Sequence, residues 1–154
     1  MAGTWPAARA ALVALLEGLT WQVDGHEQET LTASEFPHSA VPTKHPYAYI
    51  PPPRRSQSPG SGRQRRTVIQ ARVRVVLAGK SPPGGMRPLS ERLEAAIAAI
   101  GNALDGAVAL GGAADVIGPE RDYTGLEQWP EDGDGWGFVL ELPVTVTETV
   151  TLTA

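Results

Sequence analysis

The chain has 154 residues, of which 42% are hydrophobic and 19% are charged. This length and balance suit a single domain, residues 1–154, with one apolar core, and they exclude a disordered chain or a coiled coil. The net charge of −4 argues against a general attraction to nucleic acid, and the lack of cysteine excludes disulfides and thiolate chemistry.

The N-terminal half begins with a predicted helix at residues 6–18. Thr4 is placed to cap this helix, and leucines recur at helical spacing along one face. The apolar run at residues 10–16 is too short to cross a bilayer, so we expect a protein that is made in the cytoplasm and has no membrane contact. Irregular chain is expected at 34–44, and short strands at residues 20–25, 29–33 and 47–50.

A polar segment, residues 51–66, follows with the sequence PPPRRSQSPGSGRQRR. Apart from proline it contains no apolar side chain, so it has no place in a core. We expect it to form a long projecting loop, or the tip of a hairpin. Five of the thirteen basic residues of the chain lie here: Arg54, Arg55, Arg63, Arg65 and Arg66.

The C-terminal half contains the two clearest strand signals. Apolar and polar side chains alternate along residues 67–78 and again along residues 136–147, which predicts two long, half-buried antiparallel strands. Between them, apolar residues at spacings of three and four predict a helix from Pro88 to Leu104. Residues 106–135 are ambiguous, and there we expect short strands near 107–110 and 115–117 followed by a loop.

The order of these elements is helix, strands, long strand, helix, strands. Two helices of this kind cover one face of a sheet, because each has a single apolar side to bury. The sequence therefore predicts an α+β fold, a two-layer sandwich in which two helices pack on one face of a mainly antiparallel sheet.

A search for catalytic motifs finds only incomplete ones. Gly79-Lys80-Ser81 lacks the rest of a phosphate-binding loop, because Arg74 stands where the first glycine belongs and prolines follow at Pro82 and Pro83. No G-x-S-x-G elbow is present. We therefore expect no catalytic or cofactor-binding residues and no enzyme activity, although a small enzyme of unrecognised type remains an alternative.

Metal binding is not expected either. The three histidines, His26, His38 and His45, are widely spaced and share no element. Residues 131–135, with the sequence EDGDG, look like part of a calcium loop. Counted from Asp132, however, the twelfth position is Pro143, where a bidentate glutamate is needed. A tight acidic turn before the last strand is the better interpretation.

The five arginines of residues 51–66 are the candidate partner-binding residues. One interpretation is a solvated excursion whose charges protect neighbouring edge strands from aggregation. The other is a docking arm that becomes ordered on an acidic neighbour or a phosphate backbone. No aromatic residue lies in the segment, so stacking on single-stranded bases is not supported. Long sheet edges beside such an arm suit repeated contacts around a closed ring.

The order of elements resembles that of the tail terminator proteins of long-tailed bacteriophages, and of related neck and tail-completion proteins. The resemblance covers most of the chain and rests on pattern, without a signature motif. Its elements are the helix with Leu12–Leu19, the strand Tyr47–Ile50, the long loop, the strand Thr67–Leu77, the helix Leu93–Leu104 and the strand Trp136–Val146.

This resemblance implies a structural virion protein of the tail or neck, assembled in the host cytoplasm. Such proteins form a homo-oligomeric, hexameric ring that caps the tail tube and meets the head-side connector, and DNA passes through the ring without specific binding. The arm at residues 51–66 would then reach a neighbouring subunit, the tube protein or the connector protein. The alternatives are a nucleic-acid-binding module that uses Arg54–Arg66, or another neck or head-completion protein.

Overall fold

The computed structural model describes residues 4–23, 25, 27–35, 46–59, 64–78, 86–107, 110, 116–117, 121–129 and 135–149. The chain order of the elements is α1 (Trp5–Leu16), β1 (Thr20–Trp21), β2 (Glu29–Thr30), β3 (Thr32–Ser34), β4 (Tyr47–Tyr49), β5 (Arg54–Pro59), β6 (Gln64–Ala78), α2 (Met86–Asp105), β7 (Val116–Ile117), β8 (Asp122–Tyr123), β9 (Glu127–Trp129) and β10 (Gly135–Thr149). The fold is α+β, which confirms the predicted class.

The long antiparallel pair β6–β10 forms the centre of the main sheet. Its register runs from Trp136 opposite Ala78 to Thr149 opposite Gln64. Short strands line its two edges: β4 and β5 pair with β6, whereas β9, β8 and β7 pair with β10. Every described pairing in this sheet is antiparallel except that of β3 with β4. The strands β1 and β2 form a separate two-stranded ribbon.

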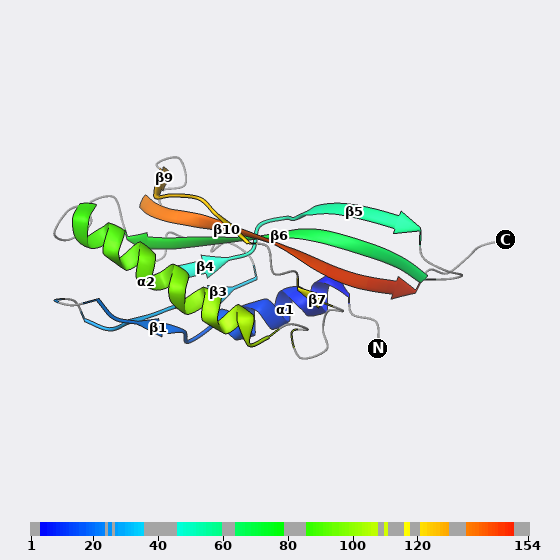
Figure 1. Ribbon diagram of the computed structural model, residues 1–154, viewed down its shortest axis with the longest axis horizontal. Helices are drawn as coiled ribbons and strands as arrows, with labels where there is room; N and C mark the ends of the chain where they lie inside the picture. The colour runs from blue at the N-terminus through cyan, green and yellow to red at the C-terminus, as the bar shows by residue number, and fades with distance from the viewer. Residues whose placement is uncertain are drawn as a thin grey trace.

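Both helices lie on the same side of this sheet (Figure 1). Facing them are alternate residues of the two long strands, which are almost completely buried: Ile69, Ala71, Val73, Val75 and Leu77 of β6, and Phe138, Leu140, Leu142, Val144 and Val146 of β10. Burying an aliphatic or aromatic side chain of this size contributes about 1.5–3 kcal/mol to folding. The layered arrangement therefore follows from the period-two pattern of the sequence. We call the opposite side of the sheet the open face.

The first helix begins and ends at local signals in the sequence. The N–H of Ala7 donates to Oγ1 of Thr4, so the predicted cap is confirmed. The helix ends at Leu16, two residues before the predicted end at Gly18, which has a φ of 83°. Glycine adopts this left-handed conformation without steric cost, so the chain turns here and leads into β1.

The loop predicted at residues 51–66 is wrong where strands form, at 54–59 and 64–66, whereas the alternative that placed this segment in a hairpin agrees with the structure. Six residues form β5, and β6 begins at Gln64, so the arginine-rich segment is part of a β-hairpin. Backbone hydrogen bonds to β6 hold β5 in place, and these bonds need no apolar side chain. We call β5, residues 64–70 and residues 143–149 the arm, and Figure 1 shows that it extends beyond the helices.

Four other predictions need correction. The expected loop after residue 117 contains β8 and β9, which pair along the edge of β10. The strand expected at 107–110 is not formed at either described residue, Ala107 or Leu110. The strand expected at 20–25 has only two residues, and the one at 29–33 is split into β2 and β3. Strands of two or three residues are too short to show alternation, so the sequence does not reveal them.

Candidate docking surface

Four of the five candidate arginines lie in strands of the arm. Arg54 and Arg55 are in β5, Arg65 and Arg66 are in β6, and Arg63 lies outside the described residues. The side chains of Arg54 and Arg66 are exposed. Arg54 is opposite Gln70, and Arg66 is opposite Ser58 and Thr147. Because residues opposite one another on neighbouring strands share a face, the structure places Arg54 and Arg66 on the open face.

The open face continues past the arm as a row of polar residues on β6. Arg72 and Arg74 follow Arg66 on this face, since side chains two residues apart point the same way. Nε of Arg72 lies 3.2 Å from Oε1 of Glu141 on β10, and both side chains are more than a third exposed. Exposed pairs of this kind contribute at most about 1 kcal/mol, so Arg72 can exchange Glu141 for a carboxylate of another molecule at little cost.

Aromatic residues surround Arg74 at the other end of this face. Its guanidinium carbon lies 3.9 Å from the ring centroid of Trp129 and 5.8 Å from that of Tyr49. Nε1 of Trp129 donates to Oε2 of Glu127 at 3.0 Å, which fixes the indole ring. Cation–π contacts of this geometry contribute about 0.5–2 kcal/mol, so Arg74 is held in place as part of a small aromatic cluster.

Gly137 lets Trp129 lie flat on β10. A Cβ atom at this position would come within 2.0 Å of the carbonyl oxygen of Val75 and 2.6 Å of the indole ring. The register between β6 and β10 shifts at the same point, between Trp136 and Gly137. A glycine is therefore required where the strand bends to receive the aromatic ring.

A half-open hollow of about 290 Å³ lies beside this cluster on the open face. Its described lining consists of two guanidinium groups, one carboxylate and apolar walls, and no hydroxyl, thiol or imidazole group is among these residues. Such a mixture suits contact with the side chains of a partner. The lining residues are Pro51, Arg72, Arg74, Glu127, Trp129 and Val139.

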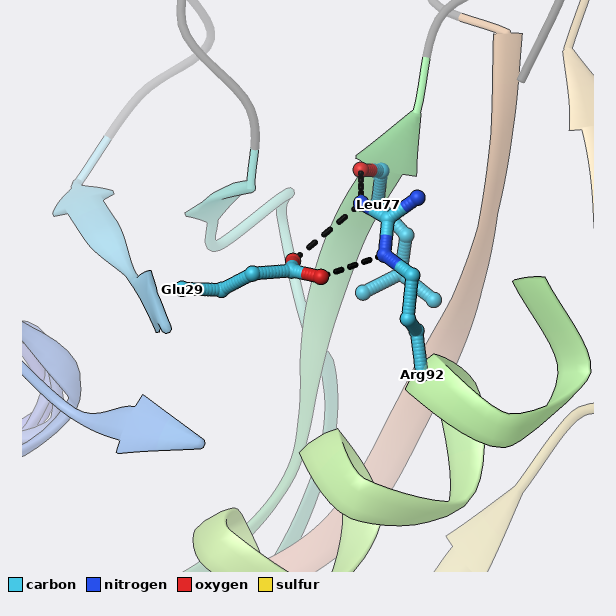
Figure 2. A network of polar contacts seen from close by, with 3 residues as sticks. All are labelled: Glu29, Leu77 and Arg92. Atoms are coloured by element: carbon cyan, nitrogen blue, oxygen red, sulfur yellow. Dashed lines mark hydrogen bonds and ion pairs between the residues drawn. The ribbon is translucent and has the colours of Figure 1, made fainter. Parts of the chain in front are cut away.

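Two further arginines, both nearly buried, join elements within the fold. Figure 2 shows Arg92 of α2 reaching the carboxylate of Glu29 on β2 and the backbone carbonyl of Leu77 on β6. Nη2 donates to Oε2 of Glu29 at 3.1 Å and to the carbonyl oxygen of Leu77 at 2.7 Å, and Nε also donates to Glu29. This network ties the β1–β2 ribbon to the helix and to the sheet.

Arg121 makes a similar connection at the other end of α2. Its Nη1 donates to the carbonyl oxygen of Gly101 at 3.2 Å and lies 2.8 Å from Oδ1 of Asp105. A cation is stabilising at the C-terminus of a helix, where the carbonyl groups point outward. Burial raises the pKa of the neighbouring Tyr123, and the positive charge of Arg121 opposes that rise. This cluster therefore anchors β8 to the helix.

The outer face of α2 is the second charged surface of the molecule. Glu91, Glu94 and Asp105 are exposed there, and Arg87 is the basic residue beside them. Ala98 and Asn102, also exposed, lie between the acidic residues. Positions 91, 94, 98, 102 and 105 follow the three-and-four spacing of one helical stripe, so these groups form a single surface.

Several residues considered in the sequence analysis lie outside the described residues. They are the three histidines His26, His38 and His45, the segment 79–81, and the acidic turn at 131–134. Among the residues that the structure does describe, no three metal-ligating side chains gather in one place. In that same part of the chain, no helix combines the length and the hydropathy needed to cross a membrane.

Sequence reasoning located the arginines of the arm but missed the aromatic end of the open face. The alternation of Gln70, Arg72 and Arg74 with apolar residues already showed which side chains of β6 face outward. Nothing in the sequence indicated that Trp129 folds over Gly137, because β9 is too short to give a period. No protein-family model matches the chain, and no curated protein matches its sequence.

Proposed function

We propose that the chain is a structural virion protein of a long-tailed bacteriophage, a tail terminator. Copies of it form a ring, hexameric in the family it resembles, that caps the tail tube and joins it to the head-side connector. The support is the order of elements together with the arm, a polar extension of the sheet that projects past the helices (Figure 1). Another neck or head-completion protein is the related alternative.

The charge distribution is the observation that carries the proposal. Residues 51–66 hold five of the thirteen basic residues and no acidic residue. The other eight basic residues stand against all seventeen acidic ones, which gives the rest of the chain a net charge of −9. A basic segment on an otherwise acidic chain favours contact between two copies of the chain, in which the basic segment of one copy meets the acidic part of the next. Head-to-tail contacts close into rings when the rotation between copies allows it.

The mechanism follows from the shape of a ring subunit. A subunit with a surface that resembles one contact surface of the tube protein binds the end of the tube. If it lacks the opposite surface, no further tube protein adds and growth stops. We expect the arm to choose the partner by pairing with acidic groups, and the body of the sheet to position it.

The test is to replace all five arginines, Arg54, Arg55, Arg63, Arg65 and Arg66, by glutamine. Light scattering and imaging should show a ring for the natural chain and smaller species for the variant, with circular dichroism unchanged. Ion pairs at a surface contribute about 0.2–1 kcal/mol each, so five of them contribute about 1–5 kcal/mol in total and assembly should weaken at least about fivefold. A natural chain that stays monomeric, or a variant that caps tails at full yield, would contradict the proposal.

Salt dependence separates the nucleic-acid alternative from this function. Binding of DNA through about five phosphates should weaken by orders of magnitude between about 50 and 200 mM salt. A gel-shift titration with double-stranded DNA measures this directly. Tight DNA binding with such a slope, and no ring at any protein concentration, would favour a nucleic-acid-binding module.

A further inference from the structure

The two outer surfaces of the layered domain carry opposite charge. On the open face, the described arginines are Arg54, Arg66, Arg72 and Arg74, and the described carboxylates, Asp122, Glu127 and Glu141, all lie outside the arm. On the outer face of α2, three exposed carboxylates stand against Arg87 and against Arg121, which contacts Asp105. The arm end of the open face is therefore basic, whereas the exposed charges along α2 are mainly acidic.

These surfaces cannot meet within one chain. The arm lies at one end of the long axis of the molecule and α2 toward the other (Figure 1). The sheet itself also separates them, because α2 packs on the face opposite to Arg54 and Arg66. Any contact between the two charged surfaces must therefore join two molecules.

We propose that the arginines on the open face of the arm bind the outer face of α2 in a second copy of this chain. The inference deepens the proposed function and rests on it, since it names the surface on which the arm docks. Contact of this kind is head to tail, because each copy offers its arm to one neighbour and its helix to another.

The spacing of the charges on the two surfaces is compatible. Arg54 pairs with Gln70 and Arg66 with Ser58, so the two arginines are four residues apart along the hairpin, about 13 Å. Glu94 and Asp105 are eleven residues apart on the helix, about 16 Å. Long arginine side chains cover the difference, so Glu94 and Asp105 are in reach at once.

The outer face of α2 also allows a strand to approach it. Ala98 and Asn102, which lie between the acidic residues, have short side chains. The existing partners of the carboxylates are weak or peripheral: Nε of Arg87 lies 3.8 Å from Oε1 of Glu91 with both groups exposed, and Asp105 remains 69% exposed beside Arg121. These carboxylates therefore keep acceptor positions for a second copy.

The test reverses the charge on each surface separately and then on both. The helix variant carries Glu91→Lys and Glu94→Lys, and the arm variant carries Arg54→Glu and Arg66→Glu. Asp105 is left unchanged because it contacts Arg121. The matched control carries Glu27→Lys, Gln28→Lys and Ala14→Lys at three exposed positions away from both surfaces, with the same change in net charge as the helix variant.

Light scattering should show at least about tenfold weaker assembly for the helix variant and for the arm variant, because each brings like charges together. An equimolar mixture of the two should assemble again, since each reversed surface then meets its complement. The chain that carries all four substitutions should also assemble alone, with an affinity within about threefold of that of the natural chain. The control should assemble as the natural chain does.

Three results would overturn the inference. They are normal assembly of the helix variant, loss of assembly in the control to the same degree, and no recovery in the mixture although circular dichroism shows both variants folded. If the five-arginine variant fails to assemble while the helix variant assembles normally, the arm docks elsewhere and only this inference fails. A natural chain that is monomeric at every concentration removes the proposed function itself.

Discussion

The same two strands, β6 and β10, pass through two different environments. In the half of the sheet near α2, one side packs on helices and the other carries the aromatic cluster around Trp129. In the arm, β5 pairs with β6 and β6 pairs with β10, and the exposed side chains described there include Arg54 and Arg66. The first half is held by burial on the helix side, and the outer part of the arm is held mainly by backbone pairing. Stability and partner choice are therefore separated along one hairpin.

This separation shows how a small domain can carry a charged extension and remain folded. The buried face continues into the arm as far as Thr67 and Val146, both 0% exposed. Beyond them the pairing of Arg66 with Thr147 extends the same hydrogen-bonded ladder outward. Substitutions of buried residues should therefore change the free energy of unfolding, whereas substitutions of exposed side chains in the arm should change assembly alone.

The largest effect is expected for Phe138→Ala. Phe138 is fully buried between the sheet and the helices and contacts Tyr123 at a ring-centroid distance of 6.3 Å. Removing a buried phenyl ring costs about 3–5 kcal/mol, because the transfer energy is lost and a cavity remains. Urea denaturation followed by circular dichroism measures this change. A loss below about 1 kcal/mol would show that the site is not packed as described.

An intermediate effect is expected for Arg92→Met. The methionine keeps the apolar stem but leaves the carboxylate of Glu29 and the carbonyl of Leu77 without their donor (Figure 2). Hydrogen bonds to charged groups contribute about 1.5–3 kcal/mol, so we expect a loss of about 2–3 kcal/mol in denaturant titrations.

The double variant Arg92→Met, Glu29→Met sharpens this comparison. Removing both partners leaves no buried charge without a counterpart, so the double variant should be more stable than the sum of the two single losses predicts. Strict additivity in the double-mutant cycle would mean that the two side chains do not interact in solution. The network would then not be what attaches the β1–β2 ribbon.

The contrast between the two regions also explains what could be predicted from the sequence. The long strands and both helices were found because burying one face imposes a period on the residues, as at Ile69 to Leu77. The strands β8 and β9 were missed because two or three residues show no period, and β5 was missed because its residues are all polar except for proline. The fold class was therefore predictable, and the edges of the sheet were not.

The candidate surface was predictable to the same limited degree. Composition alone singled out the arginines of residues 51–66, since no core accommodates them. Which of them share a face depends on the register of β5 against β6, and this register is a tertiary property. The same holds for Trp129 and Gly137, whose contact joins β9 to a bend in β10.

The smallest effect on stability is expected for Arg54→Gln with Arg66→Gln. Both side chains are exposed on the open face of the arm, and exposed substitutions outside special backbone positions change the free energy of unfolding by less than about 0.5 kcal/mol. Glutamine keeps the length and polarity of the side chain, so only the charge is lost. Denaturation should be unchanged while light scattering shows weaker assembly.

A matched variant with Arg72→Gln distinguishes the arm from the rest of the open face. Arg72 is also partly exposed on this face, but it lies nearer α2 and is paired with Glu141. If the arm alone carries the contact, Arg72→Gln should assemble as the natural chain does. If both variants weaken assembly equally, the docking surface is the whole open face and not the arm alone. A loss of stability in the arm variant would instead mean that the arginines hold the hairpin together.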